Sequence, residues 1–564
     1  MLAWRKNLPL FITALLLLSA ALAGCQAEPG AQTQQPSPAA SRSETEGAVL
    51  SSFTTADFTG PGSCATCHIA LTDESGADVS MPNMWRSTMM ANAAKDPVWQ
   101  AKVSSEVARL PHLKNEIEQK CTTCHMPMGK TQAVTDGHTV AALGNGFYDP
   151  THPLHDAAMD GVSCTLCHQV QDENLGLEES FSGGYLVDTS TDAPDRPIFG
   201  PYEHPVGEQM QSMSGFTPVY SAHMGTSEHC GTCHNLYTPF VDSKGEIAGE
   251  FPEQTPYTEW QHSRFGAEDV SCQSCHMPKA EGGVAISIIP GNLEKREPFY
   301  QHFFVGGNAL MAQILSDNAA DLGVTAEAAH FSDTRARVID QMQNQTAHLT
   351  LDSFIHEGDY LTASLRVTSL TGHKFPTSFP TRRAWLHVTI MDAAGAVIFE
   401  SGKPNDDGSI SGCDADTDPS TYEPHHDTIS AEDQVQIYEP VMGTSDGEVT
   451  YTLLRAGQYL KDNRILPDGA QKAELPADIA VYGAAADDAD FKGGSDVVTY
   501  QIQVPDAQGP FTIHAELLYQ PLSYPFIQDL LKDQTPLTVQ FDGYYAKADK
   551  SPLLVTAIKP EQAR

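Results

Sequence analysis

Basic residues are scarce in this chain of 564 residues. It has 33 lysines and arginines against 72 aspartates and glutamates, for a formal net charge of −39. Proteins that bind nucleic acid neutralise phosphate with lysine and arginine, so this balance argues against nucleic acid as a partner. Partner proteins with basic docking surfaces fit an acidic surface, although a solvated surface without a partner explains the balance equally well. The length predicts two or more domains.

The start of the chain lacks an apolar run long enough for a stable membrane span. The run from Leu8 to Leu22 follows two basic residues and ends in the sequence LAGC. This pattern is typical of a lipoprotein signal peptide over residues 1–25, with Cys25 lipidated; a plain secretory signal and an uncleaved anchor are the alternatives. Residues 26–56, rich in Gln, Pro, Ser and Ala, predict a flexible tether. We therefore expect an exported, lipid-anchored protein on the periplasmic side of a membrane or at the outer-membrane surface.

The cysteines have one repeated pattern. Ten of the twelve fall in five runs of the form C-x-x-C-H, whereas composition alone predicts about 0.01 such runs. The runs comprise Cys64, Cys67 and His68; Cys121, Cys124 and His125; Cys164, Cys167 and His168; Cys230, Cys233 and His234; and Cys272, Cys275 and His276. The pattern therefore carries chemical meaning.

Each run has the spacing of covalent haem attachment. Two cysteines three positions apart form thioethers to the vinyl groups of one haem, and the adjacent histidine donates a nitrogen to iron as the proximal ligand. Four-cysteine zinc sites are the competing interpretation, but they use pairs two at a time and do not explain the histidine after every pair. The sequence therefore predicts five c-type haems. With Cys25 lipidated, only Cys413 remains, which excludes an intramolecular disulfide framework.

The second face of each haem accepts a distal ligand or stays open, and this choice sets potential and access. His155, with His152 as its alternate, lies just upstream of the third run and is either a ligand or part of a solvated loop. His302 precedes glycines that allow close backbone approach. His373 lies between a turn-like glycine and a Phe-Pro pair, and His425 is a weaker candidate.

Seven segments carry a pattern that extends beyond the five runs. They are PGSCATCH (61–68), MWRSTMMANA (84–93), DGVSCTLCHQV (160–170), FTPVYSAHMGTSEHCGTCHNLYTP (216–239), SCQSCHMP (271–278), HFFVGGNALM (302–311) and TGHKFPTSFPTRRAWLHV (371–388). In these segments the chain resembles the multihaem cytochromes c of the nitrifier tetrahaem type, the cytochrome c-554-like family. The resemblance covers most of the chain after the tether. Because this chain has five runs, the pattern transfers and the family's haem arrangement does not.

The resemblance implies further ligands. Aligning Trp85 with the family's tryptophan puts Met90 where the family has a distal histidine, so Met90 or Met89 is a candidate ligand, with core packing as the alternative role. His223 lies where the family has a distal ligand. His229 is expected to be a hydrogen-bonding neighbour, for instance to a haem propionate.

The periodicity of the chain changes after the last run. Residues 308–344 have apolar residues at helical spacing, which predicts two helices at the end of a haem domain over 57–345. A period of two then predicts strands in an all-β, sandwich-like domain over 346–564. These strands are expected at 361–367, 385–390, 449–453, 498–504 and 511–519. The predicted fold is multidomain: a loop-rich, mainly α multihaem cytochrome c domain followed by the β-domain.

An acidic loop at 405–420 interrupts the predicted β-domain. It has Asp414, Asp416 and Asp418 at alternating positions, a spacing that suits calcium. The loop lacks the glycine and terminal glutamate of a full calcium loop, so a solvated turn is the alternative.

Three functions fit these observations. The first is electron transfer by a lipid-anchored cytochrome that passes single electrons through five haems to redox partner proteins. The second is an oxidoreductase that acts on a small nitrogen or sulfur compound at one open haem; against it stand the acidic charge and the lack of a C-x-x-C-K run, which nitrite reductases use at the catalytic haem. The third is binding or sensing through the β-domain.

Overall fold

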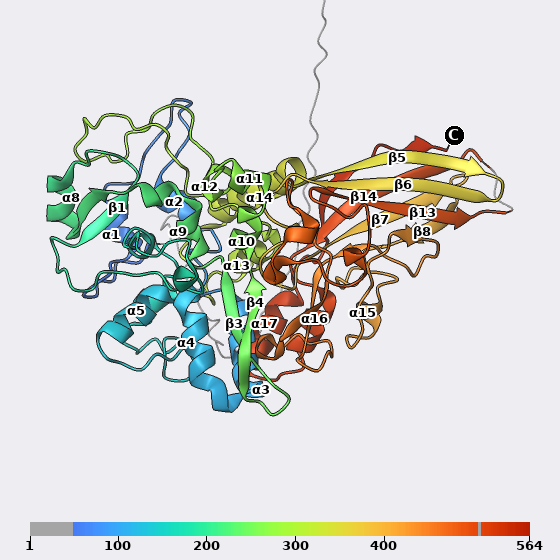
Figure 1. Cartoon of the computed structure of the whole chain (residues 1–564). Coiled ribbons are helices and arrows are strands. Elements are labelled where there is room, and N and C mark those ends of the chain that lie inside the picture. The colour runs from blue at the N-terminus through green and yellow to red at the C-terminus, as the bar shows by residue number, and fades with distance from the viewer. Residues whose placement is uncertain (1–48, 506–508, 564) are drawn as a thin grey trace, which may run out of the picture. The chain divides into compact units, whose positions relative to one another are not determined.

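The computed structural model describes residues 49–505 and 509–563 (Figure 1). The predicted signal peptide, Cys25 and most of the tether lie outside these residues. Part of the segment 49–56, which the sequence assigned to the tether, contacts the haem-motif region: Phe53 contacts the apolar cluster around Phe58, and the Ser51 carbonyl accepts a hydrogen bond from the Gly62 amide at 2.8 Å. In the described ranges, no helix is long and apolar enough to cross a membrane.

Residues 57–345 consist largely of short helices joined by loops. The helices are α1 (Pro61–Ala65), α2 (Met81–Trp85), α3 (Pro97–Arg109), α4 (Lys114–His125), α5 (Pro127–Thr135), α6 (His155–Met159), α7 (Cys164–Cys167), α8 (Gly207–Ser214), α9 (Ser227–Gly231), α10 (Pro256–Gln261), α11 (Arg264–Ala267), α12 (Cys272–His276), α13 (Ala309–Asp317) and α14 (Ala328–Gln345). The last two occupy the region where the sequence predicts two helices. The β1 (Pro197–Gly200) and β2 (Thr217–Tyr220) strands pair in parallel, and β3 (Leu236–Val241) pairs antiparallel with β4 (Ile247–Gln254).

The long strands after residue 346 form two sheets (Figure 1). The first sheet contains β5 (Ala347–Glu357), β6 (Tyr360–Ser369), β13 (Ser495–Gln503) and β9 (Thr428–Ile429), in that order. The second contains β10 (Ile437–Tyr438), β7 (Arg383–Met391), β14 (Thr512–Gln520) and β15 (Leu553–Ala557), with β8 (Val397–Ser401) on β7 and β16 (Glu561–Gln562) on β14. A separate pair joins β11 (Pro440–Gly443) to β12 (Gln458–Asp462).

Alternating side chains from the two sheets meet in one core. Leu361 and Leu365 of β6 are fully buried, as are Val388 and Ile390 of β7, and all belong to the same apolar cluster. Successive residues on a strand point to opposite faces, so the period of two seen in the sequence buries one face of each sheet.

The C-terminal half also contains elements that the sequence did not predict. Three helices occur within it: α15 (Asp414–Thr417), α16 (Tyr524–Leu530) and α17 (Pro536–Tyr545). The strand expected at 449–453 is absent, because Val449 makes only an isolated bridge and a 3₁₀ turn begins at Leu453. Two of these helices, α16 and α17, and the segment from Tyr451 to Leu453 pack against α3 instead of extending a sheet.

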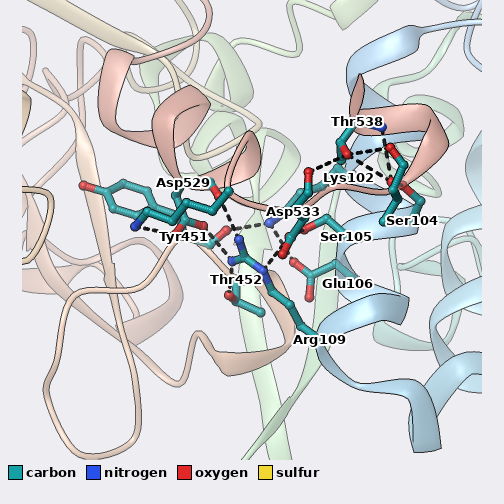
Figure 2. Close-up of polar contacts among 12 residues, drawn as sticks. Lys102, Ser104, Ser105, Glu106, Arg109, Tyr451, Thr452, Asp529, Asp533 and Thr538 are labelled. Carbon is teal, nitrogen blue, oxygen red and sulfur yellow. Dashed lines mark hydrogen bonds and ion pairs between the residues drawn. The ribbon is translucent and has the colours of Figure 1, made fainter. Parts of the chain in front are cut away.

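The contact between α3 and the C-terminal half is strongly polar (Figure 2). Arg109 pairs with Asp529 at 2.6 Å and with Asp533 at 2.8 Å. The buried Lys102 ammonium donates to the Tyr451 carbonyl at 2.7 Å and pairs with Glu106 of its own helix at 2.8 Å. Since charge-assisted hydrogen bonds hold a defined geometry, α3 is fixed against this segment. Residues 47–564 accordingly cluster as one unit, and the division at residue 345 stays a prediction.

Candidate haem sites and the cavity they line

The five C-x-x-C-H runs adopt one local conformation. In each of the runs that begin at Cys64, Cys164 and Cys230, the histidine amide donates to the carbonyl of the first cysteine at 3.0 Å. The other two runs lie inside α4 and α12. One helical turn places residues i and i+3 on the same face, so both cysteines of a run can reach one macrocycle.

All fifteen motif residues line a single cavity of about 1700 Å³. They come from segments spread over more than 200 residues of sequence, from Cys64 to His276. Residues 370–373, 375–379 and 382 and Tyr519 of β14 also line the cavity, so the β-rich half forms part of its wall. A large space that is lined by the ten thiols and five imidazoles of the motifs fits covalently attached haems.

Four of the five motif histidines have the tautomer that iron ligation requires. Their Nδ1 atoms donate to backbone carbonyls: His68 to Ile286 at 2.6 Å, His125 to Ala93 at 3.0 Å, His168 to Phe199 at 2.6 Å and His276 to Val305 at 2.5 Å. A carbonyl only accepts, so the proton is on Nδ1 and Nε2 keeps its lone pair. Burial lowers the pKa of His125 and the pKa of His234, each to about 4. The His234 ring also faces the cavity. Both rings are therefore neutral at pH 7.

Two further histidines face motif histidines across the cavity. The ring centres of His302 and His168 are 6.4 Å apart and their planes differ by 14°; for His373 and His276 the values are 6.2 Å and 19°. An imidazole nitrogen lies about 2 Å from a bound metal and about 1 Å from its own ring centre, so two axial imidazoles have centres roughly 6 Å apart. His302 and His373 donate through Nδ1 to Tyr300 and Lys374 carbonyls, which leaves Nε2 available in both.

The structure places the other histidine candidates differently. His223 donates from Nε2 to the Val170 carbonyl at 2.9 Å and accepts at Nδ1 from the Ser221 hydroxyl at 2.6 Å. It is not among the described residues that line the cavity, so the geometry argues against the prediction that it is a distal ligand. His155 donates from Nδ1 to Phe147 at 2.7 Å and also lies off the cavity wall. Its role as a ligand stays a prediction.

His425 belongs to a different part of the protein. Its ring lies in the β-rich half, where Nε2 contacts Asp488 at 2.9 Å and Nδ1 contacts the Gln436 and Asn463 amides. The structure therefore corrects the weaker prediction that it is a distal ligand, since both of its nitrogens are bonded away from the cavity.

Met90 and Met89 both line the cavity and are half-buried. Met89 also packs against the apolar cluster of α13 and α16, which suits the core role. Trp85 is buried and donates from its indole nitrogen to the Val162 carbonyl at 2.9 Å, two residues before Cys164. This bond holds the methionine segment beside the third motif. Methionine ligation stays a prediction.

His229 and Arg382 line the cavity but were not predicted as ligands. The Nδ1 atom of His229 is buried without a hydrogen-bond partner, and burial lowers the pKa of this ring to about 3. Arg382 donates to the Thr377 carbonyl at 3.0 Å, and within the described ranges no carboxylate forms an ion pair with it. The adjacent Arg383 is instead buried and pairs with both oxygens of Asp416. Nothing in the local sequence indicated that only Arg382 of this adjacent pair would face the cavity.

Thiols from different motifs lie side by side in the cavity. Thiols of neighbouring motifs lie close together in three pairs: Cys64 with Cys164, Cys124 with Cys233 and Cys230 with Cys272. Cys167 and Cys233 are close enough to interact electrostatically. The first motif therefore adjoins the third, and the fourth adjoins the second, third and fifth.

The acidic loop at 405–420 does not converge on a calcium site. Asp416 pairs with Arg383 and accepts a hydrogen bond from the Ile410 amide. Asp418 accepts hydrogen bonds from Ser420 in an exposed turn. The calcium prediction at Asp414, Asp416 and Asp418 is not supported, because arginine already compensates the central carboxylate.

Neither a family model nor a curated protein sequence matches the chain. One solved structure is similar. It is the crystal structure of a penta-haem cytochrome c552 from Thermochromatium tepidum, with 15% sequence identity and a TM-score of 0.49, covering 88% of this chain and 98% of that one.

Proposed function

We propose that this protein is a pentahaem c-type cytochrome that relays single electrons. The observation that carries the proposal is that all five motifs line one cavity and adjoin one another through their thiols. Bound haem irons would supply the one-electron chemistry, and the protein supplies attachment, axial ligands and burial. The fourth motif is central, since it adjoins three of the other four.

The axial ligands follow from the ring geometry. His302 pairs with His168, and His373 pairs with His276, because each pair has the spacing of two imidazoles on one metal and a free Nε2 on both rings. Two histidine ligands hold a low potential. His373 lies in the β-rich half, so that half takes part in redox chemistry instead of being an appendage.

One observation favours a second function, reduction or oxidation of a small anion at an open haem. Arg382 faces the cavity. Burial and the charge of His276 lower the pKa of His234 most, and the charge of Arg382 lowers it further. An arginine without an ion-pair partner binds a carboxylate or an oxyanion, so it fits a haem propionate under the relay proposal and a substrate under this one.

Electron paramagnetic resonance of the purified ferric protein, with and without cyanide, separates the two functions. The relay predicts five low-spin haems that do not respond to cyanide, because every iron has two protein ligands. A high-spin haem that binds cyanide would overturn the pure relay and place the oxidoreductase first.

The anchor and partners complete the proposal. Lipidation at Cys25 would hold the protein at a membrane, and the net charge of −39 would steer basic redox partners to it. We expect Cys25→Ser to move the protein from the membrane fraction to the soluble fraction while its haem spectrum stays unchanged. Persistence of the variant at the membrane would contradict the anchor.

A further inference from the structure

A cluster of carboxylates in the β-rich half lies outside the haem cavity and the acidic loop. It comprises Asp427, beside β9, Asp488 and Asp490, in the loop before β13, and Asp496, within β13. One oxygen from each of Asp427, Asp488 and Asp490 lies within 4.8 Å of the others. Asp488 and Asp496 likewise form a group of this size with His425.

Asp496 adjoins Asp488 and is fully buried. Its Oδ2 accepts from the Tyr438 hydroxyl at 2.7 Å and from Gln436 at 3.3 Å. Its Oδ1 is buried without any hydrogen-bond partner. A buried carboxylate oxygen without a partner is costly and implies that something else satisfies it.

A proton is a poor answer to that requirement. A proton on Oδ1 would need an acceptor, and none of the described residues provides one. A cation would coordinate the free Oδ1 of Asp496 and would also offset the negative charges of the neighbouring carboxylates.

The surrounding groups select the kind of cation. The Nδ1 of His425 faces amide donors from Gln436 and Asn463, so it accepts, and Nε2–H donates to Asp488 at 2.9 Å. His425 therefore orients a carboxylate and is not itself a ligand. Lys472 donates to the backbone carbonyls of Asp488 and Ala485 and forms no ion pair with the four carboxylates. The remaining donors are all oxygens.

We propose that Asp427, Asp488, Asp490 and Asp496 form a calcium site. Calcium takes six to eight oxygen ligands in flexible geometry, whereas magnesium usually keeps several waters and one or two carboxylates, and zinc prefers nitrogen and sulfur. The half-exposed Asp488 and Asp490 and the exposed Asp427 form the mouth, through which the ion and its water ligands would enter. The bound ion links β9, β13 and the loop that precedes β13.

The test uses the full-length haem-loaded protein, dialysed against chelator and then titrated with calcium chloride. We expect one calcium per chain by atomic emission and a rise in Tm of roughly 2 °C when calcium exceeds Kd a hundredfold. Asp427→Asn combined with Asp490→Asn, both outside the core, should abolish retention and the Tm rise. Asp414→Asn combined with Asp418→Asn is the matched acidic control and should leave both unchanged.

Several outcomes would overturn the site. These are the absence of retained calcium in the unaltered protein, equal retention by the Asp427/Asp490 variant, and tighter binding of zinc chloride that His425→Gln abolishes. The haem spectrum should stay constant throughout, so the outcome is independent of the proposed relay.

Discussion

Replacing both Cys230 and Cys233 with alanine is expected to leave four covalently bound haems instead of five. The pyridine haemochrome absorbance per chain should fall to about four-fifths, because each C-x-x-C-H run attaches one haem. The larger effect is on electron transfer between haems. The fourth motif adjoins the second, third and fifth through its thiols, so loss of its haem separates the remaining haems into groups. In stopped-flow reduction with a substoichiometric one-electron donor, redistribution among the remaining haems should become slow and multiphasic.

The matched control replaces Cys64 and Cys67 with alanine. It also removes one haem, but the first motif adjoins only the third, through Cys164, among the thiol neighbours described above. The four remaining haems should therefore still exchange electrons in one fast phase. Equal redistribution rates in the two variants, with equal haem counts and matching circular dichroism, would contradict the central place of the fourth motif.

His373→Ala is expected to convert one of five haems from low-spin to high-spin. The ring centres of His373 and His276 are 6.2 Å apart. Alanine removes the imidazole that would bind the iron on the side opposite His276. About one-fifth of the iron should give a high-spin resonance that shifts with cyanide, and His302→Ala should do the same at the haem of His168. His373→Met should instead keep the haem low-spin and raise its potential, on the order of 0.1 V.

The control for this series is His223→Gln. Both nitrogens of His223 are bonded to Val170 and Ser221, so its substitution should leave all haems in their original spin state. A new high-spin signal in this variant, or an unchanged low-spin spectrum in His373→Ala, would reverse the ligand assignment.

The haem-attachment prediction rests on a local pattern. Each predicted attachment site is contained in five residues, and one helical turn is enough to direct both cysteines to one side. His223 shows the opposite case: a pattern near the fourth motif suggested a ligand, but the Val170 carbonyl, 53 residues away in sequence, takes its Nε2. The helices α16 and α17 were missed in a similar way, because their apolar residues pack on α3 and α13, which the local sequence does not reveal.

The sequence by itself determined the acidic charge and was enough to predict the haem-attachment residues and the proximal histidines, because covalent spacing and composition need no long-range contact. Only the tertiary structure decided that five motifs share one cavity, that His302 and His373 face His168 and His276, and that Arg382 enters the cavity while Arg383 is paired. It also brought the carboxylates of Asp427, Asp488 and Asp490 together and placed Asp488 beside the buried Asp496. These arrangements depend on strands and loops distant in the chain, and packing and hydrogen bonding bring their side chains within contact distance.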